Sequence, residues 1–454
     1  MRALLLLCAP VLLECSRAVF HVHLALSSRG ESVRVSWRSG PGDVLGAGTS
    51  TVEYGFEPAA LTRQASGGNW SWIDYNNPFG GTNRTYTHNL VELPPLPPGA
   101  TVYYRCGDAH DGWSSVASFT APRASFPPGA PLTAVIFGDM GWTNAQTLPA
   151  LQDEALRQPD LFLSTGDLGY NLEYRDGAVG DAYQSAMESI TSSTPTMGCV
   201  GNHEVMLDFI HYTHRYRAYV GDAPASGLTP AGVAGLVGGL PNNHWYSFEL
   251  GAGTPSGVHF LVLSSEAYFY YNLSAAQLAW ACADLAAVDR ARTPWLIAVA
   301  HRSIYCSCDS DCDGDAATLR AGLEPLLNEH RVDLFVNGHE HNTERHYAVR
   351  DGRLVTGPSA GAPGGNASRP EVLRDAAAPI YLVTGCAGNV EGHEMFQRPQ
   401  PAYSAFRAAT YGYSRLTVHN ASALLLELVQ ADTGQEALPG TVIDAMLLLR
   451  TRAA

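Results

Sequence analysis

The sequence has neither a surplus of basic residues nor an internal apolar run long enough to cross a membrane. Its 28 basic residues are outnumbered by 43 acidic ones, which gives a formal net charge of −15. Nucleic acids and anionic membrane surfaces are bound through basic patches, so this balance argues against both as partners. An anionic substrate would need local cations to draw it in, and bound metal ions could supply them.

The apolar run near the N-terminus is too short to span a bilayer. It covers Ala3–Leu13, follows a basic residue and ends before Glu14. Small residues at Ser16 and Ala18 then predict a secretory signal peptide over residues 1–18, with cleavage after Ala18. We therefore expect a secreted, extracellular protein, with the lysosome as an alternative destination.

Sequons and cysteines also bear on the compartment. The Asn-x-Ser/Thr triplets that predict N-glycosylation are Asn69, Asn83, Asn272, Asn366 and Asn420. The cysteines after the predicted signal peptide are Cys106, Cys199, Cys282, Cys306, Cys308, Cys312 and Cys386. This number is odd, so at least one cysteine must remain outside any disulfide within the chain, and the pairing stays open.

Residues 19–122 alternate apolar and polar side chains between turn signals, which is typical of half-buried β-strands. The clearest strands are Val33–Trp37, Thr51–Tyr54 and Thr101–Cys106. The early tryptophan and a Leu-x-Pro-Gly corner ahead of the last strand resemble a fibronectin type III sandwich. His21 and His23 lie on one side of a strand, but two histidines without further ligands make a poor metal site.

A stretch rich in proline and alanine at 123–131 predicts a linker, and the pattern then changes. Residues 132–454 contain continuous apolar strands and helical segments, which predicts an α/β fold. The expected core strands are Leu132–Phe137, Leu161–Ser164, Thr196–Val200, Val258–Leu263, Trp295–Ala300, Val332–Asn337 and Ile380–Val383. The expected helices are Thr143–Arg157, Tyr183–Ile190 and Leu273–Val288, and strands at Arg415–Val418 and Ala423–Leu428 are expected to pair as a hairpin.

Several of these strands end in residues that can bind metal ions. The strand ends are Gly138-Asp139, Gly166-Asp167, Gly201-Asn202-His203-Glu204, His301 and Gly338-His339-Glu340-His341. Ligands of open α/β sheets bind at the carboxyl ends of the strands. Tyr170 follows Asp167 closely, and a phenol is a poor ligand unless a strongly charged ion such as ferric iron lowers its pKa. A turn aspartate, a packed tyrosine or a surface histidine explains each feature alone, but not all of them together.

This ordered set of motifs resembles that of the metallophosphoesterases, and the tyrosine after the second aspartate is similar to the purple acid phosphatase branch. Segments at Trp245–Phe248, Arg302–Ser307 and Tyr411–Arg415 also resemble that family, so the resemblance covers nearly the whole mature chain. It implies a β-sheet sandwich flanked by helices over 132–454, C-terminal strands included, preceded by the fibronectin type III-like domain.

The resemblance also implies a set of metal ligands. The expected ligands are Asp139, Tyr170 and His341 for a ferric ion; Asn202, His301 and His339 for a divalent Zn, Fe or Mn ion; and Asp167 as the bridge between the two. Oxygen ligands suit a trivalent ion, whereas imidazoles suit Zn or ferrous iron. His339 and His341 lie two residues apart, so in an extended segment their side chains would project to the same side.

Two ions about 3.5–4 Å apart clamp a phosphate and stabilise an in-line displacement. We therefore expect an acid phosphatase that hydrolyses small phosphate monoesters through a metal-bound hydroxide, with His203 as a catalytic residue beside the phosphoryl oxygens. A trivalent ion acidifies bound water strongly, which would permit activity at low pH. A phosphodiesterase or nucleotidase on the same core is one alternative, which Tyr170 disfavours. A secreted metal-binding module without catalysis is the other.

One region departs from the family pattern. Many relatives have a histidine shortly after the His301 motif that binds phosphate or protonates the leaving group, but Cys306–Asp315 contains none. His203 or an aspartate of this loop is then the candidate acid. The loop resembles the start of a calcium-binding loop, yet Arg320 stands where the closing glutamate would be. We expect a disulfide-pinned acidic loop at the rim of the site, and not a calcium site or zinc knuckle.

Overall fold

The structure is a computed structural model that describes residues 19–40, 49–74, 84–110, 112–123, 130–219, 243–270, 273–309, 312–357, 365–431 and 439–451. The predicted signal peptide, most of the predicted linker and the sequons at Asn83 and Asn272 lie outside the described residues. The other three sequon asparagines, Asn69, Asn366 and Asn420, are exposed.

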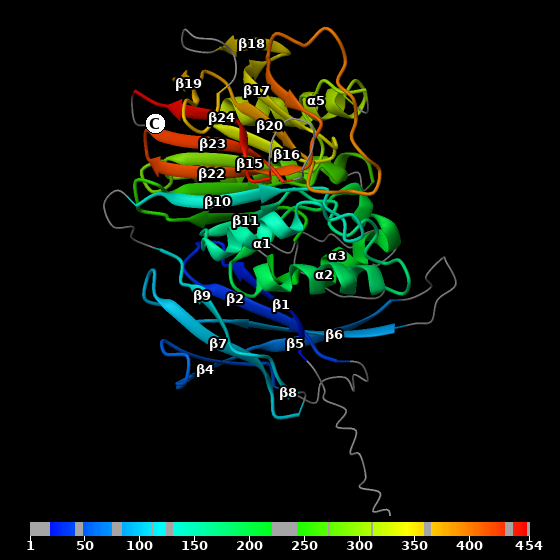
Figure 1. Ribbon diagram of the computed structural model, residues 1–454, viewed down its shortest axis with the longest axis vertical. Helices are drawn as coiled ribbons and strands as arrows, with labels where there is room; N and C mark the ends of the chain where they lie inside the picture. The colour runs from blue at the N-terminus through cyan, green and yellow to red at the C-terminus, as the bar shows by residue number, and fades with distance from the viewer. Residues whose placement is uncertain are drawn as a thin grey trace, which may run out of the picture.

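The N-terminal region is all β and consists of two antiparallel sheets (Figure 1). The first sheet has the order β1 (Phe20–Leu26), β2 (Val33–Arg38), β6 (Arg84–Glu92) and β5 (Gly68–Asp74). The second has the order β4 (Arg63–Ser66), β3 (Thr51–Gly55), β7 (Thr101–Asp108) and β8 (Gly112–Trp113), with β9 (Ala117–Thr120) also paired to β7, on the same edge as β8. Their apolar faces share one core, in which Trp37 and Tyr104 are buried. The all-β prediction for this region is confirmed.

The rest of the chain contains two larger sheets. One has the order β12 (Thr196–Gly198), β11 (Leu161–Ser164), β10 (Leu132–Phe137), β22 (Gly412–Asn420), β23 (Ala423–Gln430), β24 (Val442–Leu449) and β19 (Glu371–Arg374). The other has the order β13 (Tyr246–Leu250), β14 (Val258–Val262), β15 (Trp295–Val299), β16 (Leu334–Asn337), β20 (Ile380–Thr384), β17 (Thr343–Arg350) and β18 (Arg353–Thr356), with β21 (Ser404–Ala408) paired to β17.

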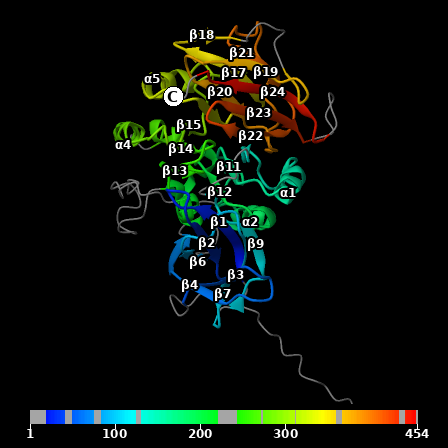
Figure 2. The same cartoon turned by 90° about the vertical axis from the view of Figure 1, so that its left-hand side faces the viewer.

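These two sheets pack face to face and are covered by helices on their outer faces. Alternate residues of β14 point to opposite sides, because Phe260 joins the core between the sheets and Leu261 joins the core under the helices. Figure 2 shows α4 (Ser274–Ala286) and α5 (Asp315–Glu329) on one side, and α1 (Leu148–Leu156) and α2 (Ala178–Thr191) on the other. The predicted sandwich flanked by helices is therefore confirmed.

Several secondary-structure predictions need correction. The first helix begins at Leu148, later than predicted, with a proline in its first turn. Residues ahead of it form a loop, in which the Asn144 side-chain amide donates hydrogen bonds to the carbonyl oxygens of Gly388 and Asn389, both at 2.6 Å. Helix α5 was not predicted, because its start lies in the acidic stretch expected to be a loop.

The N-terminal region contacts the helical face of the larger sandwich through β1. His21 and His23 are both buried at this contact, where no third histidine or carboxylate joins them as a metal-binding group in the described residues. His21 Nε2 lies 3.2 Å from Ser185 Oγ, and His23 Nε2 lies 2.9 Å from the Thr196 carbonyl oxygen. They are packing residues that join the two regions.

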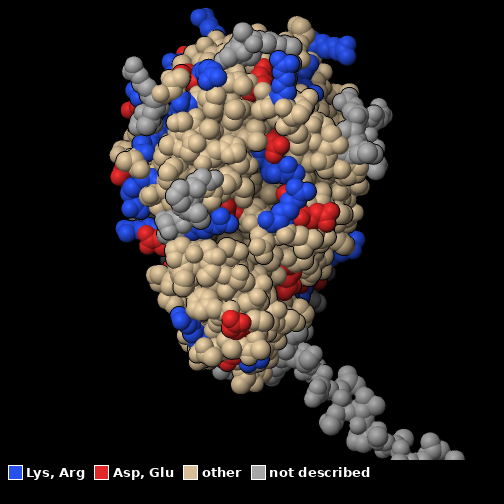
Figure 3. Space-filling model, turned by 60° about the vertical axis from the view of Figure 1, so that its left-hand side comes forward, with Lys and Arg blue, Asp and Glu red and all other residues tan. Residues whose placement is uncertain are grey.

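Surface charges are mixed on the face shown in Figure 3, where arginine side chains lie beside aspartate and glutamate in small groups. Among the described residues, no helix has both the length and the apolar character needed to cross a membrane.

Candidate metal centre

The candidate ligands converge because they follow strands that run in the same direction. β10, β11 and β12 are parallel neighbours in one sheet, and β14, β15, β16 and β20 are parallel neighbours in the other. Asp139 and Asp167 follow β10 and β11, whereas His301 and His339 follow β15 and β16. Both sheets therefore deliver side chains to a single edge of the sandwich, as parallel sheets do.

The first group brings together Tyr170, His341 and Asp139. The Tyr170 hydroxyl lies 2.7 Å from His341 Nε2, and the same nitrogen lies 3.7 Å from Asp139 Oδ1. All three residues are buried. The group contains a phenol, a carboxylate and an imidazole, and it matches the set expected for a ferric ion.

The second group brings together Asn202, His301 and His339. His301 Nε2 lies 2.9 Å from Asn202 Oδ1, and the His301 and His339 rings are 5.0 Å apart between centroids. Asp167 Oδ2 is 3.2 Å from His301 Nε2, and Asp167, His301 and His339 can each direct one ligand atom to a common point. This group is richer in nitrogen, as expected for the divalent ion.

The backbone at the centre is held in conformations that L-residues rarely adopt. Asp139, Asp167, Tyr170 and His339 all have positive φ values, between 50° and 69°. Such residues cost about 1–3 kcal/mol each and gather at functional sites, where the surrounding structure enforces them. The φ of 69° at His339 also corrects one prediction, because the segment that carries His339 and His341 bends and is not extended.

Two glycines are required by the close approach of the carboxylates. A Cβ at Gly201 would overlap Oδ1 of Asp167, and a Cβ at Gly338 would overlap Oδ2 of Asp139. Each glycine therefore makes room for a carboxylate that comes from a different strand end. This explains physically why glycine precedes the Asn202 and His339 motifs.

The protein alone does not balance the charges of this centre. Burial raises the pKa of Asp139 well above its usual value. Burial and the nearby Asp139 carboxylate together raise the pKa of Tyr170 well above its usual value. Burial alone would lower the pKa of His301, but the Asp167 carboxylate raises it to about 10. Cations at this point would reverse these tendencies and favour carboxylate, phenolate and neutral imidazole, the forms that bind metal. The donor set therefore fits metal ions.

A buried glutamate organises the bridging position. Glu204 accepts hydrogen bonds from the backbone amides of Asp167, Leu168 and Gly201 at 2.9–3.0 Å. It fixes the turn that carries Asp167 against the turn that carries Asn202. Burial raises the pKa of Glu204 to about 8, and the negative charge of Asp167 adds to this effect.

His203 lies beside the predicted ligands and reaches the surface. Its ring lies 4.3 Å from the Tyr170 ring between centroids, and its side chain is 22% exposed. Nδ1 is 2.7 Å from Asn171 Oδ1, while Nε2 is 4.0 Å from Asp167 Oδ2. The Nδ1 contact fixes the ring so that Nε2 points toward the carboxylate.

A segment that follows β20, which the sequence motifs did not indicate, completes the site. Glu391 is 49% exposed and lies 3.6 Å from His203 Nε2 and 3.8 Å from His341 Nε2. His393 Nδ1 is 2.7 Å from the His341 carbonyl oxygen, and Glu394 accepts a hydrogen bond from the His341 amide. Because β20 continues the parallel set and is followed by glycine, the same strand-end pattern could have identified this segment.

A second missed residue lies directly after His301. Arg302 Nη1 lies 3.0 Å from His339 Nε2, and Arg302 also pairs with Glu266 at 2.9 Å and with Asp315. Asp315 is the residue of the acidic stretch that reaches this arginine, and it begins α5. The guanidinium is therefore fixed beside the nitrogen-rich group, with its charge balanced by the two carboxylates.

Comparisons with known proteins agree with this geometry. Residues 19–121 match the purple acid phosphatase N-terminal domain, residues 132–343 the calcineurin-like phosphoesterase family, and residues 378–438 the iron/zinc purple acid phosphatase-like protein C-terminal family. Acid phosphatase type 7 of Danio rerio is 33% identical over 95% of this chain and 91% of that protein. Acid phosphatase type 7 of Homo sapiens is 30% identical over 94% of this chain and 92% of that protein.

A solved structure has the same fold. The purple acid phosphatase from yellow lupin (Lupinus luteus) seeds superposes with a TM-score of 0.71 and 22% identity, covering 96% of this chain and 75% of that one. The relatives, the family matches and the fold agree over almost the whole chain. The protein is an enzyme of the purple acid phosphatase family, and its dinuclear centre is that of a metallophosphoesterase.

Proposed function

We propose that this enzyme is a secreted acid phosphatase that hydrolyses small phosphate monoesters at a centre of one Fe(III) and one divalent ion. One observation carries the proposal: an oxygen-rich group and a nitrogen-rich group lie at the same edge of the sandwich, and Asp167, whose carboxylate contacts His301 at 3.2 Å, is available there as a bridge. Asp139, Tyr170 and His341 would hold iron, and Asn202, His301 and His339 would hold Zn, Fe or Mn. When bound, this ion pair supplies Lewis acidity to the phosphoryl group and an activated water.

The residues around the centre bind and orient the substrate. His203 donates its Nδ1 proton to Asn171, so that Nε2 faces the position of a phosphoryl or leaving-group oxygen. When Nε2 carries a proton, it can give that proton to the leaving oxygen. Arg302 contacts His339 and is paired with Glu266 and Asp315, so it would position that imidazole, and the bound ions would supply the charge that attracts an anionic ester.

The remaining parts of the proposal concern processing and organisation. Residues 1–18 would be removed as a signal peptide, 19–122 would form the N-terminal domain, 123–131 the linker and 132–454 the catalytic domain. The exposed positions of Asn69, Asn366 and Asn420 support glycosylation on the secretory route. Treatment of secreted protein with an amidase that removes N-glycans should lower its mass, and an unchanged mass would contradict secretion with glycosylation.

The direct test of substrate class compares two chromogenic esters on the intact enzyme. We expect para-nitrophenyl phosphate to be hydrolysed much faster than bis-para-nitrophenyl phosphate, with highest activity at acid pH. Preference for the bis ester would favour a phosphodiesterase. A protein that holds two metals yet hydrolyses neither ester would overturn the proposed activity.

A further inference from the structure

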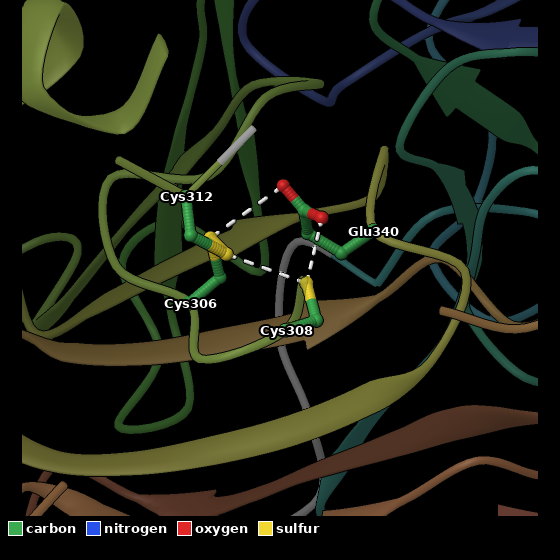
Figure 4. Close-up of side chains that lie close together, drawn as sticks. All are labelled: Cys306, Cys308, Cys312 and Glu340. Atoms are coloured by element: carbon green, nitrogen blue, oxygen red, sulfur yellow. Dashed lines mark hydrogen bonds between the residues drawn. A yellow bond between two sulfur atoms is a disulfide. The ribbon is translucent and has the colours of Figure 1, made fainter. Parts of the chain in front are cut away.

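Three cysteines and a carboxylate meet next to the candidate metal centre (Figure 4). Cys306 and Cys312 form a disulfide, as predicted for this loop, and Cys308 Sγ lies 3.3 Å from Cys312 Sγ. The Cys308 thiol donates a hydrogen bond to Glu340 Oε2 at 2.9 Å, and Cys306 Sγ lies 3.5 Å from Glu340 Oε1. All four residues are buried.

A third sulfur in contact with a disulfide sulfur is the encounter that precedes thiol–disulfide exchange. We propose that these three cysteines form an internal exchange site, in which the disulfide moves between Cys306–Cys312 and Cys308–Cys312. This proposal is independent of the phosphatase activity. The two disulfide pairings involve only the residues of this buried cluster.

The exchange balances without any external reagent. Cys308, as a thiolate, attacks Cys312 Sγ; the Cys308–Cys312 bond forms, the Cys306–Cys312 bond breaks, and the electron pair leaves on Cys306. The proton that Cys308 gives up ends on Cys306. Glu340 presents one carboxylate oxygen to each of the two sulfurs that exchange roles.

Chain entropy favours neither pairing strongly. The two disulfides link residues separated by 6 and by 4 positions in the sequence. Loop-closure entropy distinguishes rings of these lengths by only about a factor of two. Ring size alone therefore excludes neither pairing, and the short distance between the Cys308 and Cys312 sulfurs makes the second one reachable.

The backbone around the cysteines is held from outside the loop. The Gln397 amide donates to the Ser307 carbonyl oxygen at 2.8 Å, and the Asp309 amide donates to the Met395 carbonyl oxygen at 3.0 Å. Cys308 also forms a β-bridge with Phe396. These bonds keep the sulfurs together whichever pair is joined.

The site is placed where exchange can affect catalysis. Glu340 lies between His339 and His341 in the sequence, and exchange changes which cysteine presents a thiol to its carboxylate. The loop is also fixed to the segment that follows Glu394, whose carboxylate binds the His341 amide. A contact that changes with the disulfide pairing is thereby built into the support of the candidate centre.

Mass spectrometry of the intact, non-reduced enzyme tests the proposal. Trypsin releases Ser303–Arg320 as one peptide that contains all three cysteines. Because the cysteines are buried, exchange is stopped with acid, the protein is unfolded in denaturant, its thiols are alkylated with N-ethylmaleimide at pH 6 before digestion, and fragmentation of the peptide locates the label. We expect label on Cys308 and on Cys306, with the Cys306 form reaching at least about one tenth of the total after incubation at pH 8.

Three variants complete the test. Cys308→Ser should give a peptide without label, and Cys306→Ser should give an unlabelled peptide with a Cys308–Cys312 disulfide. Cys282→Ser removes an exposed cysteine outside the cluster and should leave the wild-type ratio unchanged. If Cys306→Ser does not fold, the position of the label in the wild-type peptide over time still tests the proposal.

Three results would overturn the proposal. One is label confined to Cys308 at all times in the wild type. Another is a doubly labelled peptide from folded Cys306→Ser. The third is a triply labelled wild-type peptide together with one zinc ion beyond the two of the candidate centre, which would instead identify a thiolate metal site.

Discussion

Two His-x-His pairs in this chain look alike in sequence and differ completely in the structure. His21 and His23 pack at the contact between the N-terminal region and the larger sandwich, against a serine hydroxyl and a backbone carbonyl. His339 and His341 follow a parallel strand, and their rings face His301 and Tyr170. The spacing alone does not make a metal site. The carboxylates delivered by neighbouring strand ends make the difference.

The pKa shifts of His23 and His301 have opposite directions, although burial also lowers the pKa of His341 at the candidate centre to about 4. Burial lowers the pKa of His23 to about 4, and its hydrogen bond to a backbone carbonyl raises it only in part. His301 is equally buried, yet the Asp167 carboxylate raises its pKa to about 10. Histidines that join the two regions are thus kept neutral by desolvation, whereas the candidate centre concentrates negative charge that cations can neutralise.

The largest loss of metal content and turnover is expected from Asp167→Asn. Loss of the bridging carboxylate should remove both ions and lower turnover by about a thousandfold or more, because each ion contributes several kcal/mol to the transition state. Metal analysis and steady-state kinetics measure both losses.

The matched control for that variant is Asp181→Asn, which removes a carboxylate that pairs with Arg38 and Arg215 between the two regions. It should lower stability and leave two ions per chain. Equal metal content in the two variants would contradict the assignment of the bridge to Asp167.

Alanine variants of the two His-x-His pairs should differ in metal content and turnover, by less than the loss expected for Asp167→Asn. His339→Ala should lose one ion and lower turnover by at least about a hundredfold, since the divalent position then lacks an imidazole ligand. His23→Ala should retain both ions and full turnover per folded molecule, but lose about 2 kcal/mol of unfolding free energy with its buried hydrogen bond and packing. Loss of metal from the His23 variant would show that the first pair also binds ions.

The pH dependence of stability gives a further contrast. The folded-state pKa of His23 is lowered to about 4, so the unfolded chain binds more protons than the folded chain between about pH 4 and 6.5. Stability from neutral His23 is therefore lost as the pH falls through this window. His23→Gln should gain about 2 kcal/mol relative to the wild type between pH 7 and pH 5, by denaturant unfolding of metal-free protein.

The same experiment on His301 should have the opposite sign. Its folded-state pKa is raised to about 10, so its contribution in metal-free protein is complete below about pH 6.5 and is lost as the pH rises toward 10. His301→Gln should therefore lose most stability relative to the wild type at low pH. A pH-independent difference for either variant would contradict the environments described.

The strand ends could be predicted from the sequence because apolar runs followed by glycine and a polar residue are local signals. Asp139, Asp167 and His301 follow such runs, and the structure brings them together. The glycine after β20 marks the segment that contains Glu391 but does not single out that residue, which lies several residues beyond the strand and reaches His203 only through the folded loop. The left-handed backbone of His339 is also enforced by tertiary contacts, and local propensity does not encode it.

The structure of the acidic, cysteine-rich stretch could also be predicted only in part from its sequence. Its composition predicted a loop with a disulfide, and the Cys306–Cys312 disulfide confirms that part. The helix that begins at Asp315 was missed, because a Gly-Asp-rich entry and an internal Pro325 both weaken the helical pattern. Only the fold shows that Cys308 and Glu340 come into contact.

The most direct measurement is the metal content and visible spectrum of the intact secreted enzyme, with Tyr170→Phe as its comparison. We expect two ions per chain, at least one of them iron, and a tyrosinate-to-iron absorption band that is lost in Tyr170→Phe. Fewer than two ions in an active wild-type enzyme, or a band that persists without the Tyr170 phenol, would contradict the proposed centre.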